Sequence, residues 1–159
     1  EENGMVRGTE QSTLDLGEVP LLREFDGVTL ATLRTCAVER TLKAGEILFH
    51  RKDEGDEFFL IRRGRIRIAL PMKTGKLHHV VTFARGDFFG EISFLDRKSR
   101  TADAIAETEV ALYSISRSSF DDMSRLNPVM GAMVFARVAR ELAHRLRHTD
   151  KALRRLQDA

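Results

Sequence analysis

The segment Arg65-Ile66-Arg67-Ile68-Ala69-Leu70 decides the fold class of this chain of 159 residues. Its large apolar side chains fall on every second position, with Arg65 and Arg67 between them. A period of two residues is typical of a β-strand that has one buried face and one face in water. We therefore expect Ile66, Ile68 and Leu70 to point toward a core.

Six further segments between residues 38 and 115 show the same alternation or a compact apolar run. Turns that contain Gly or Asp separate them at intervals of about ten residues, which is typical of an all-β domain. The segments are Val38–Leu42, Ile47–His50, Glu57–Arg63, His79–Ala84, Thr101–Ala106 and Val110–Ile115. Strands this short close most easily into a jelly-roll or β-roll, so the expected fold is mainly β, with about eight antiparallel strands.

Helical spacing appears on both sides of this β region. Short helices are expected between Val19 and Cys36, with Asp26 as the N-cap of the piece 27–36. Ser116 is expected to cap a helix through Leu126, and a long C-terminal helix is expected over about 129–157 because Pro128 suits a first helical turn. The polar residues 1–16 are predicted to be a linker or disordered tail, which leaves 17–159 as one domain.

The long C-terminal helix has a second pattern. Seven of its residues repeat at alternating spacings of four and three, which is a heptad seam: Phe135, Ala139, Leu142, Leu146, Thr149, Leu153 and Leu156. The seam either packs on the helix's own β-roll or pairs with a second copy. Residues 137–159 also hold seven basic side chains against three acidic ones, so this helix is basic.

Composition excludes several classes. The chain is 42% hydrophobic, which supplies one core of ordinary size, and no stretch resembles a membrane span or a signal peptide. The net charge of +2 requires no nucleic-acid or acidic partner. A single cysteine, Cys36, can form neither an intramolecular disulfide nor a thiolate metal cage. We expect a cytoplasmic protein without a bound metal.

The densest group of candidate site residues is the run Gly86-Asp87-Phe88-Phe89-Gly90-Glu91-Ile92-Ser93-Phe94-Leu95, which Ser99-Arg100-Thr101-Ala102 follows after a basic loop. No nucleophile elbow, zinc helix or dinucleotide fingerprint occurs, so we do not expect an enzyme. A helical turn that begins at Gly90 would offer free backbone N–H groups to an anion. Arg100 can return to the same place and supply a guanidinium for a phosphate.

Glu91 narrows the class of anion. A carboxylate beside a phosphate site repels the ligand unless it accepts a hydrogen bond from a hydroxyl, such as that of a sugar. One arginine, one helix end and one glutamate therefore suit a singly charged phosphodiester on a ribose better than a triphosphate. The alternative is that Glu91 caps its helix while Arg100 pairs with Glu91 or Asp96 on the surface.

These residues carry a resemblance to a known family. The region from Gly45 to Ala106 resembles the cyclic nucleotide-binding domain, the β-roll module of catabolite-activator regulators, cyclic-nucleotide-dependent kinases and nucleotide-gated channels. The matching features are Gly45-Glu46, Gly55-Asp56 before Phe58-Phe59-Leu60-Ile61, Gly64, Gly86-Asp87-Phe88-Phe89-Gly90-Glu91 and Arg100-Thr101-Ala102. With the flanking helices, the resemblance covers nearly the whole chain from about Leu16.

The resemblance implies a regulatory sensor for cAMP, or for cGMP, which the domain reports through its C-terminal helix. Glu91 would bind the ribose 2′-hydroxyl, Arg100 the cyclic phosphate, and Thr101 would lie near the phosphate and the base. In the family the last helix covers the base, so Arg140 is a candidate base contact. The full set of expected ligand-binding residues is Phe89, Gly90, Glu91, Ile92, Ser93, Ser99, Arg100, Thr101, Ala102 and Arg140.

Two other functions stay open at this stage. Only three residues follow Leu156, so the helix-turn-helix of the catabolite-activator regulators is missing. The chain is then either a truncated regulator of that type or, as we favour, a sensor attached to a bacterial transporter, channel or enzyme, itself not inserted in the membrane. A nucleotide-free dimerisation β-roll is a further alternative. We expect a homodimer through the last helix and no nucleic acid, because no aromatic residues lie between its charges.

Overall fold

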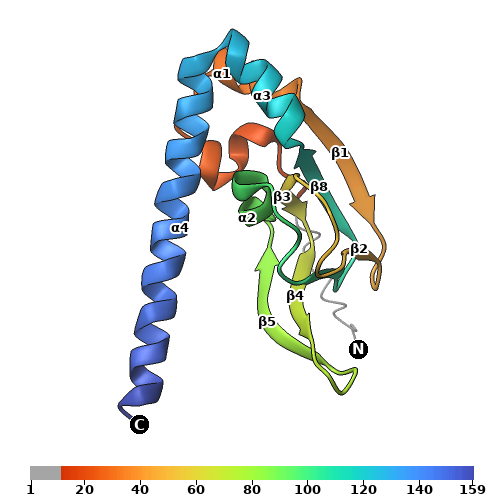
Figure 1. The fold of residues 1–159 in the computed structure, drawn as a ribbon. Coiled ribbons are helices and arrows are strands. Elements are labelled where there is room, and N and C mark those ends of the chain that lie inside the picture. Colours follow the sequence, from red (N-terminus) through yellow and green to blue (C-terminus); the bar gives the residue numbers. More distant parts are fainter. Residues whose placement is uncertain (1–11) are drawn as a thin grey trace, which may run out of the picture.

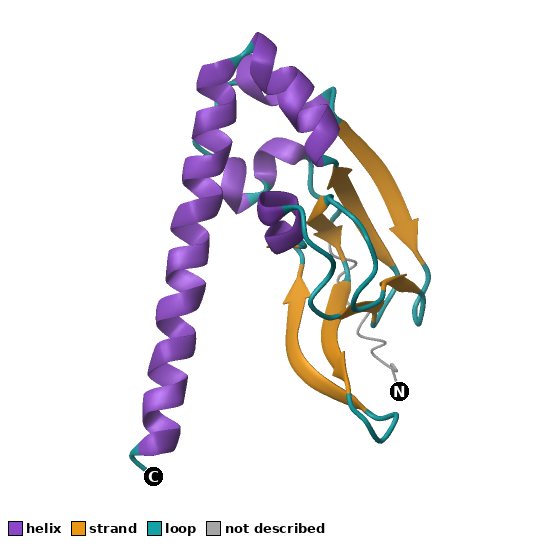
Figure 2. Ribbon diagram, in the orientation of Figure 1, coloured by secondary structure: helices purple, strands orange, loops and turns teal. Residues whose placement is uncertain are grey.

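The computed structural model describes residues 12–159, which form two four-stranded antiparallel sheets and a group of helices at one end (Figures 1 and 2). One sheet has the order β1-β8-β3-β6 and the other the order β2-β7-β4-β5. The strands are β1 (Ala37–Leu42), β2 (Ile47–Phe49), β3 (Phe58–Arg63), β4 (Arg65–Pro71), β5 (Leu77–Ala84), β6 (Phe88–Phe89), β7 (Asp103–Ala106) and β8 (Val110–Ile115). The expected fold of eight antiparallel strands is confirmed.

The helices precede, interrupt and follow the strands. They are η1 (Leu16–Glu18), η2 (Pro20–Leu22), α1 (Gly27–Arg34), α2 (Glu91–Asp96), α3 (Arg117–Leu126) and α4 (Pro128–Gln157). Both predicted caps form, since the Asp26 carboxylate accepts a hydrogen bond from the Thr29 N–H and the Ser116 hydroxyl accepts one from Ser119. No helix within residues 12–159 is long and apolar enough to cross a bilayer.

Two clusters of buried side chains divide the interior. One joins the helices to the sheet β1-β8-β3-β6. In this cluster Leu22, Phe94, Phe120 and Val134 are fully buried. The other lies between the two sheets. Four phenylalanines of this region stack in the order Phe49, Phe59, Phe89, Phe83, with ring centroids 6.0, 5.1 and 6.0 Å apart. This aromatic row joins the two sheets, because Phe59 and Phe89 belong to β3 and β6 while Phe49 and Phe83 belong to β2 and β5.

Strand β4 departs from the simple alternation that its sequence predicts. The pairing of β4 with β5 shifts between Ile68 and Ala69, so that Ile68 lies opposite Val81 while Ala69 lies opposite His79. Val80 is the extra residue of this β-bulge, and a bulge bends the strand that carries it. Within β4, Ile66 and Ala69 are fully buried, whereas Ile68 and Leu70 are partly exposed.

Several predicted boundaries differ from the structure by one or more residues. Leu14 and Leu16 are buried, and the Leu14 N–H donates to the Arg62 carbonyl at 3.1 Å, so the packed domain begins before residue 17. The predicted strand Thr101–Ala106 begins at Asp103, because the backbone of Arg100 is bonded to the turn at Lys52 and Asp53 instead of to β4. Residues 1–11 of the predicted tail lie outside the described residues.

Strand β6 was not among the strands expected from the sequence. Phe88 and Phe89 pair with Leu60 and Phe59 of β3. Two residues are too few to show any periodicity, so only the partner strand identifies them as a strand.

Helix α4 packs its apolar side chains on the domain through its first half only. Met130, Gly131, Val134 and Val138 are buried, and Leu142 still packs against the core. Beyond it, Leu146, Leu153 and Leu156 of the predicted seam are 63%, 54% and 76% exposed. Figure 1 shows the second half of α4 extending well past the group of shorter helices toward the C-terminus.

Candidate functional site

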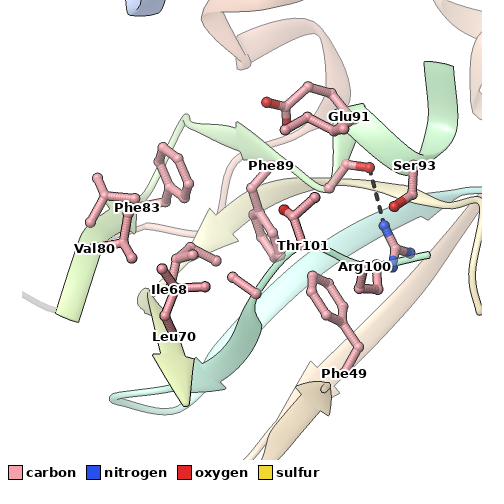
Figure 3. Close-up of a pocket in the computed structure, with 14 residues that line it drawn as sticks. Phe49, Ile68, Leu70, Val80, Phe83, Phe89, Glu91, Ser93, Arg100 and Thr101 are labelled. Atoms are coloured by element: carbon pink, nitrogen blue, oxygen red, sulfur yellow. Dashed lines mark hydrogen bonds between the residues drawn. The ribbon is translucent and has the colours of Figure 1, made fainter. Parts of the chain in front are cut away.

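A cavity of about 360 Å³ opens between β4, β5 and helix α2 (Figure 3). Its size lies within the range of small-molecule sites, roughly 300–1,000 Å³. Its lining residues are Phe49, Ile68, Leu70, Val80, Val81, Phe83, Phe89, Gly90, Glu91, Ile92, Ser93, Arg100, Thr101 and Ala102. Figure 3 shows Arg100, Ser93 and Glu91 at one end and Val80, Phe83 and Ile68 at the other. The cavity therefore has a polar end and an apolar end.

Gly90 shapes the polar end. Its φ angle is +79°, a left-handed conformation that ends β6 and begins α2. A Cβ at this position would lie 3.0 Å from the Phe59 ring, 3.1 Å from the Glu57 carbonyl oxygen and 3.2 Å from Arg100 Nη1. Only glycine therefore lets the chain turn this close to the Arg100 guanidinium.

Arg100 is the central charged group of the cavity and is only 4% exposed. Its Nη1 donates to the Gly90 carbonyl at 3.1 Å, and its Nη2 donates to Glu57 Oε2 at 3.3 Å. The guanidinium carbon lies 4.3 Å from the centroid of the Phe49 ring, so one face is held by a cation–π contact. The Nε–H is buried and has no hydrogen-bond partner within the described part of the chain.

The electrostatic setting of Arg100 follows from this burial. Loss of water lowers the pKa of the guanidinium, while the carboxylates of Glu57 and Asp56 raise it. Arginine stays protonated in proteins even so. The cavity thus contains a desolvated positive charge that holds one unsatisfied donor.

Glu91 begins α2 and is 7% exposed. Its Oε1 accepts a hydrogen bond from Arg145 Nη1 of α4 at 3.2 Å, while Arg145 Nη2 donates to the Phe88 carbonyl at 2.6 Å. The Arg145 guanidinium also lies over the Phe88 ring at 4.0 Å and the Phe83 ring at 4.7 Å. Glu91 therefore joins the cavity wall to the long helix.

The structure brings together most of the predicted site residues. All of the expected ligand-binding residues line the cavity except Ser99 and Arg140. Ser99 is exposed and lines a separate groove, with Gly55 and Lys98 among its neighbours. Arg140 is exposed on α4 and is not among the cavity residues, so its contact with a base stays a prediction.

Sequence reasoning missed two partners of the predicted residues. The alternative to the anion site paired Arg100 with Glu91 or Asp96 on the surface, whereas the ion pair that forms is with Glu57. It also missed Arg145, although a signal was present. With 100° of rotation per residue, the basic residues after Arg140 fall on the helix face opposite the heptad seam, except for Arg145. Arg145 lies beside the seam, on the side of the helix that packs on the domain.

The described residues contain no group of three or more His, Cys, Asp or Glu side chains placed to hold a metal ion. The cavity instead combines a buried cation, a carboxylate and an apolar pocket. Such a set can bind a small molecule that has an anionic group, a hydroxyl and a flat apolar part.

Comparison with known proteins agrees with this chemistry. The family model of the cyclic nucleotide-binding domain matches residues 39–127. The chain is 34% identical over 118 residues to the cAMP-dependent protein kinase regulatory subunit of Emericella nidulans, covering 74% of this chain and 27% of that protein. It is 30% identical over 110 residues to a cyclic nucleotide-gated potassium channel of Rhizobium etli, covering 69% and 29%. The chain thus spans less than a third of either relative.

Solved structures have the same architecture. The N-terminal domain of a transcriptional regulator from Streptomyces coelicolor A3(2) superimposes with a TM-score of 0.72 at 29% identity, covering 87% of this chain and 94% of that one. The Thermus thermophilus catabolite activator protein gives a TM-score of 0.74 at 26% identity, covering 87% and 63%. The matched family model, the identity to these relatives and the shared β-roll together show that the chain belongs to the cyclic nucleotide-binding domain family.

Proposed function

We propose that this domain is a regulatory sensor that binds a cyclic nucleoside monophosphate in the cavity between β4, β5 and α2. The observation that carries the proposal is the buried Nε–H of Arg100, which has no partner among the described residues. A buried donor that is left unsatisfied costs about 1–3 kcal/mol, and an anionic acceptor removes that cost. A phosphate oxygen is such an acceptor, and it also compensates the desolvated guanidinium charge.

Arg100 is already positioned for this contact before any ligand arrives. Phe49 stacks on one face, and the Gly90 carbonyl and Glu57 hold its two Nη atoms. A side chain that is ordered in advance loses little conformational entropy when it binds. In our proposal the backbones of Gly90, Ile92 and Ala102, which line the same cavity, complete the phosphate and sugar contacts.

Glu91 supplies the sugar contact in this proposal. Its Oε1 is bonded to Arg145, while Oε2 takes part in no hydrogen bond with residues 12–159. A carboxylate oxygen can only accept, so a ribose 2′-hydroxyl, which donates, matches it. The base then lies against Phe83, Val80 and Ile68 at the apolar end (Figure 3). We propose cAMP over cGMP because cAMP is the nucleotide that the kinase relatives are named for.

Helix α4 is the output element of the proposed sensor. Arg145 binds the cavity residue Glu91, and Arg137 Nε donates to the Leu21 carbonyl at 3.2 Å, so α4 is attached to the domain at two levels. A ligand shifts a conformational equilibrium only by interacting differently with the two states. A nucleotide hydroxyl at Glu91 changes the surroundings of Arg145 directly, and this gives the ligand a differential contact with the position of α4.

The exposed seam of α4 supports a homodimer. Leu146, Leu153 and Leu156 stand in water in a single chain, and pairing with a second copy would bury them. Because the chain spans less than a third of its curated relatives, we propose that it is one domain of a larger bacterial protein, a transporter, channel or enzyme that it regulates. We propose a cytoplasmic location, which agrees with the single, buried, free Cys36.

The test is isothermal titration calorimetry of the chain with cAMP and with cGMP. Arg100→Gln should weaken binding by about 100-fold, because it removes charge-assisted hydrogen bonds to the phosphate. Lys98→Gln is the matched control, since Lys98 is an exposed cation of the same loop that does not line the cavity. If neither nucleotide binds to the folded wild type, the ligand assignment is wrong and the nucleotide-free dimerisation β-roll remains.

A further inference from the structure

From Arg140 onward, α4 carries a basic face that does not line the cavity. Arg140, Arg147 and Arg154 are spaced by seven residues, and Lys151 and Arg155 fill the gaps between them. At 100° per residue, these five side chains fall within about 100° of arc on the helix surface. The two acidic residues of this part, Glu141 and Asp150, lie outside that arc. We call these five cations the basic face.

The basic face is free of internal partners. All five side chains belong to exposed residues, and none forms an ion pair with residues 12–159. By contrast, Arg137 and Arg145 of the same helix point to the domain and are both paired there. The helix therefore separates its arginines into two that attach it to the β-roll and a group that faces solvent.

The face is also long and accessible. From Arg140 to Arg155 the helix rises about 22 Å. From Arg147 onward the face lies beyond Leu142, which packs on the core, and beyond Arg145, which binds Glu91, and Figure 1 shows this end of α4 extending away from the shorter helices. The exposed leucines at 146, 153 and 156 lie on the opposite side of the helix, so pairing through the seam would leave the basic face in water.

We propose that this basic face adsorbs to an anionic lipid surface, with the helix lying along the membrane and not inserted in it. A cluster of four to eight basic residues on an amphipathic helix is typical of contact with anionic headgroups. Each cation near such a surface raises the affinity roughly five-fold. An anionic membrane surface can attract a row of exposed cations that forms no binding pocket, because the headgroup charge is spread over the surface. Such binding requires no fixed alignment between individual side chains and individual headgroups.

Nucleic acid fits this surface less well. Binding to single strands relies on aromatic stacking, and residues 140–157 contain no Phe, Tyr or Trp. The proposal does not depend on nucleotide binding, because none of the five cations lines the cavity.

The test is co-sedimentation of the chain with vesicles of neutral phosphatidylcholine and with vesicles that contain 30 mol % phosphatidylglycerol, an amount chosen on the order of a natural anionic leaflet. We expect binding to the anionic vesicles only, and loss of that binding at about 0.5 M salt because exposed charges are then screened. Replacing Arg147, Lys151 and Arg154 together by Gln should lower the affinity by about 100-fold.

The matched control replaces Arg23, Lys73 and Lys76 by Gln, three exposed cations outside α4, so that both variants lose the same net charge. Equal loss in the control would overturn the proposal, since net charge alone would then explain binding. Loss on Leu153→Ser would also overturn it, because the apolar seam would then be the contact. Tighter binding to a 20-bp duplex (a probe length of about two helical turns) than to vesicles at equal salt would assign the face to nucleic acid instead. Circular dichroism checks the fold of each variant.

Discussion

Replacement of Arg145 by Gln tests the attachment of α4 to the cavity. In the wild type, Arg145 binds Glu91 Oε1 at 3.2 Å and the Phe88 carbonyl at 2.6 Å, and its guanidinium covers the rings of Phe88 and Phe83. Its side chain is 30% exposed and that of Glu91 is 10% exposed, so water screens this pair less than a surface ion pair.

The expected loss of stability is about 2 kcal/mol. A hydrogen bond to a charged group contributes about 1.5–3 kcal/mol, and a partly exposed cation–π contact about 0.5–1 kcal/mol. Gln retains one neutral hydrogen bond and part of the packing, which offsets some of this sum. For a domain of this length, Tm should fall by about 4–8 °C.

The assay is a double-mutant cycle by thermal or urea unfolding of the wild type, Arg145→Gln, Glu91→Gln and the double variant. The interaction energy between the two side chains should be about 1–1.5 kcal/mol, because they are in direct contact. Arg140→Gln on the same helix is the control, and it should change stability by less than about 0.5 kcal/mol since Arg140 is exposed and unpaired among the described residues. An interaction energy below about 0.3 kcal/mol would refute the view that this ion pair holds α4 to the cavity.

Three further predictions concern backbone strain and the buried thiol. Lys52 has a φ angle of +73°, so Lys52→Gly should stabilise the fold by about 0.5–1 kcal/mol in urea unfolding, and a lower midpoint would contradict this. Gly64→Ala should cost more than about 2 kcal/mol of stability, because its Cβ would clash with the Glu109 carbonyl oxygen. Gly45→Ala, at a similar φ but with no described atom within 4 Å of the added Cβ, should cost about 1 kcal/mol, and equal costs would argue against the clash. Burial raises the pKa of the Cys36 thiol from 9.0 to about 11. The unfolded state therefore releases this proton first, so stability should fall as pH rises from about 9 to 11, and a Cys36→Ala variant that shows the same fall would exclude the thiol as its cause.

Local pattern was sufficient where one strand or helix determines its own structure. The alternation at Arg65–Leu70, the apolar run at Val110–Ile115 and the caps Asp26 and Ser116 each reside within a few residues, and each element formed as expected. Phe88 and Phe89 are different, because a two-residue strand exists only through its pairing with β3. The bulge at Val80 likewise depends on the register between two strands.

The candidate site divides in the same way. Gly90, Glu91 and Arg100 were found from their spacing and residue type, because a tight turn and an anion site need glycine and arginine within one short segment. Phe49 and Glu57, which hold Arg100, are more than 40 positions away along the chain, and no local period connects them to it.

Local patterns in the sequence were enough to predict the β-roll, the long terminal helix and the short segment that carries the polar end of the cavity. Three features follow from tertiary packing instead. The Arg100 Nε–H has no partner within residues 12–159, Arg145 and not Arg140 binds the cavity residue Glu91, and the apolar packing of α4 ends at Leu142. The physical reason is that side-chain periodicity reports which face of an element is buried. Which charged groups meet across that face depends on how distant elements pack, and the sequence shows no period for such contacts.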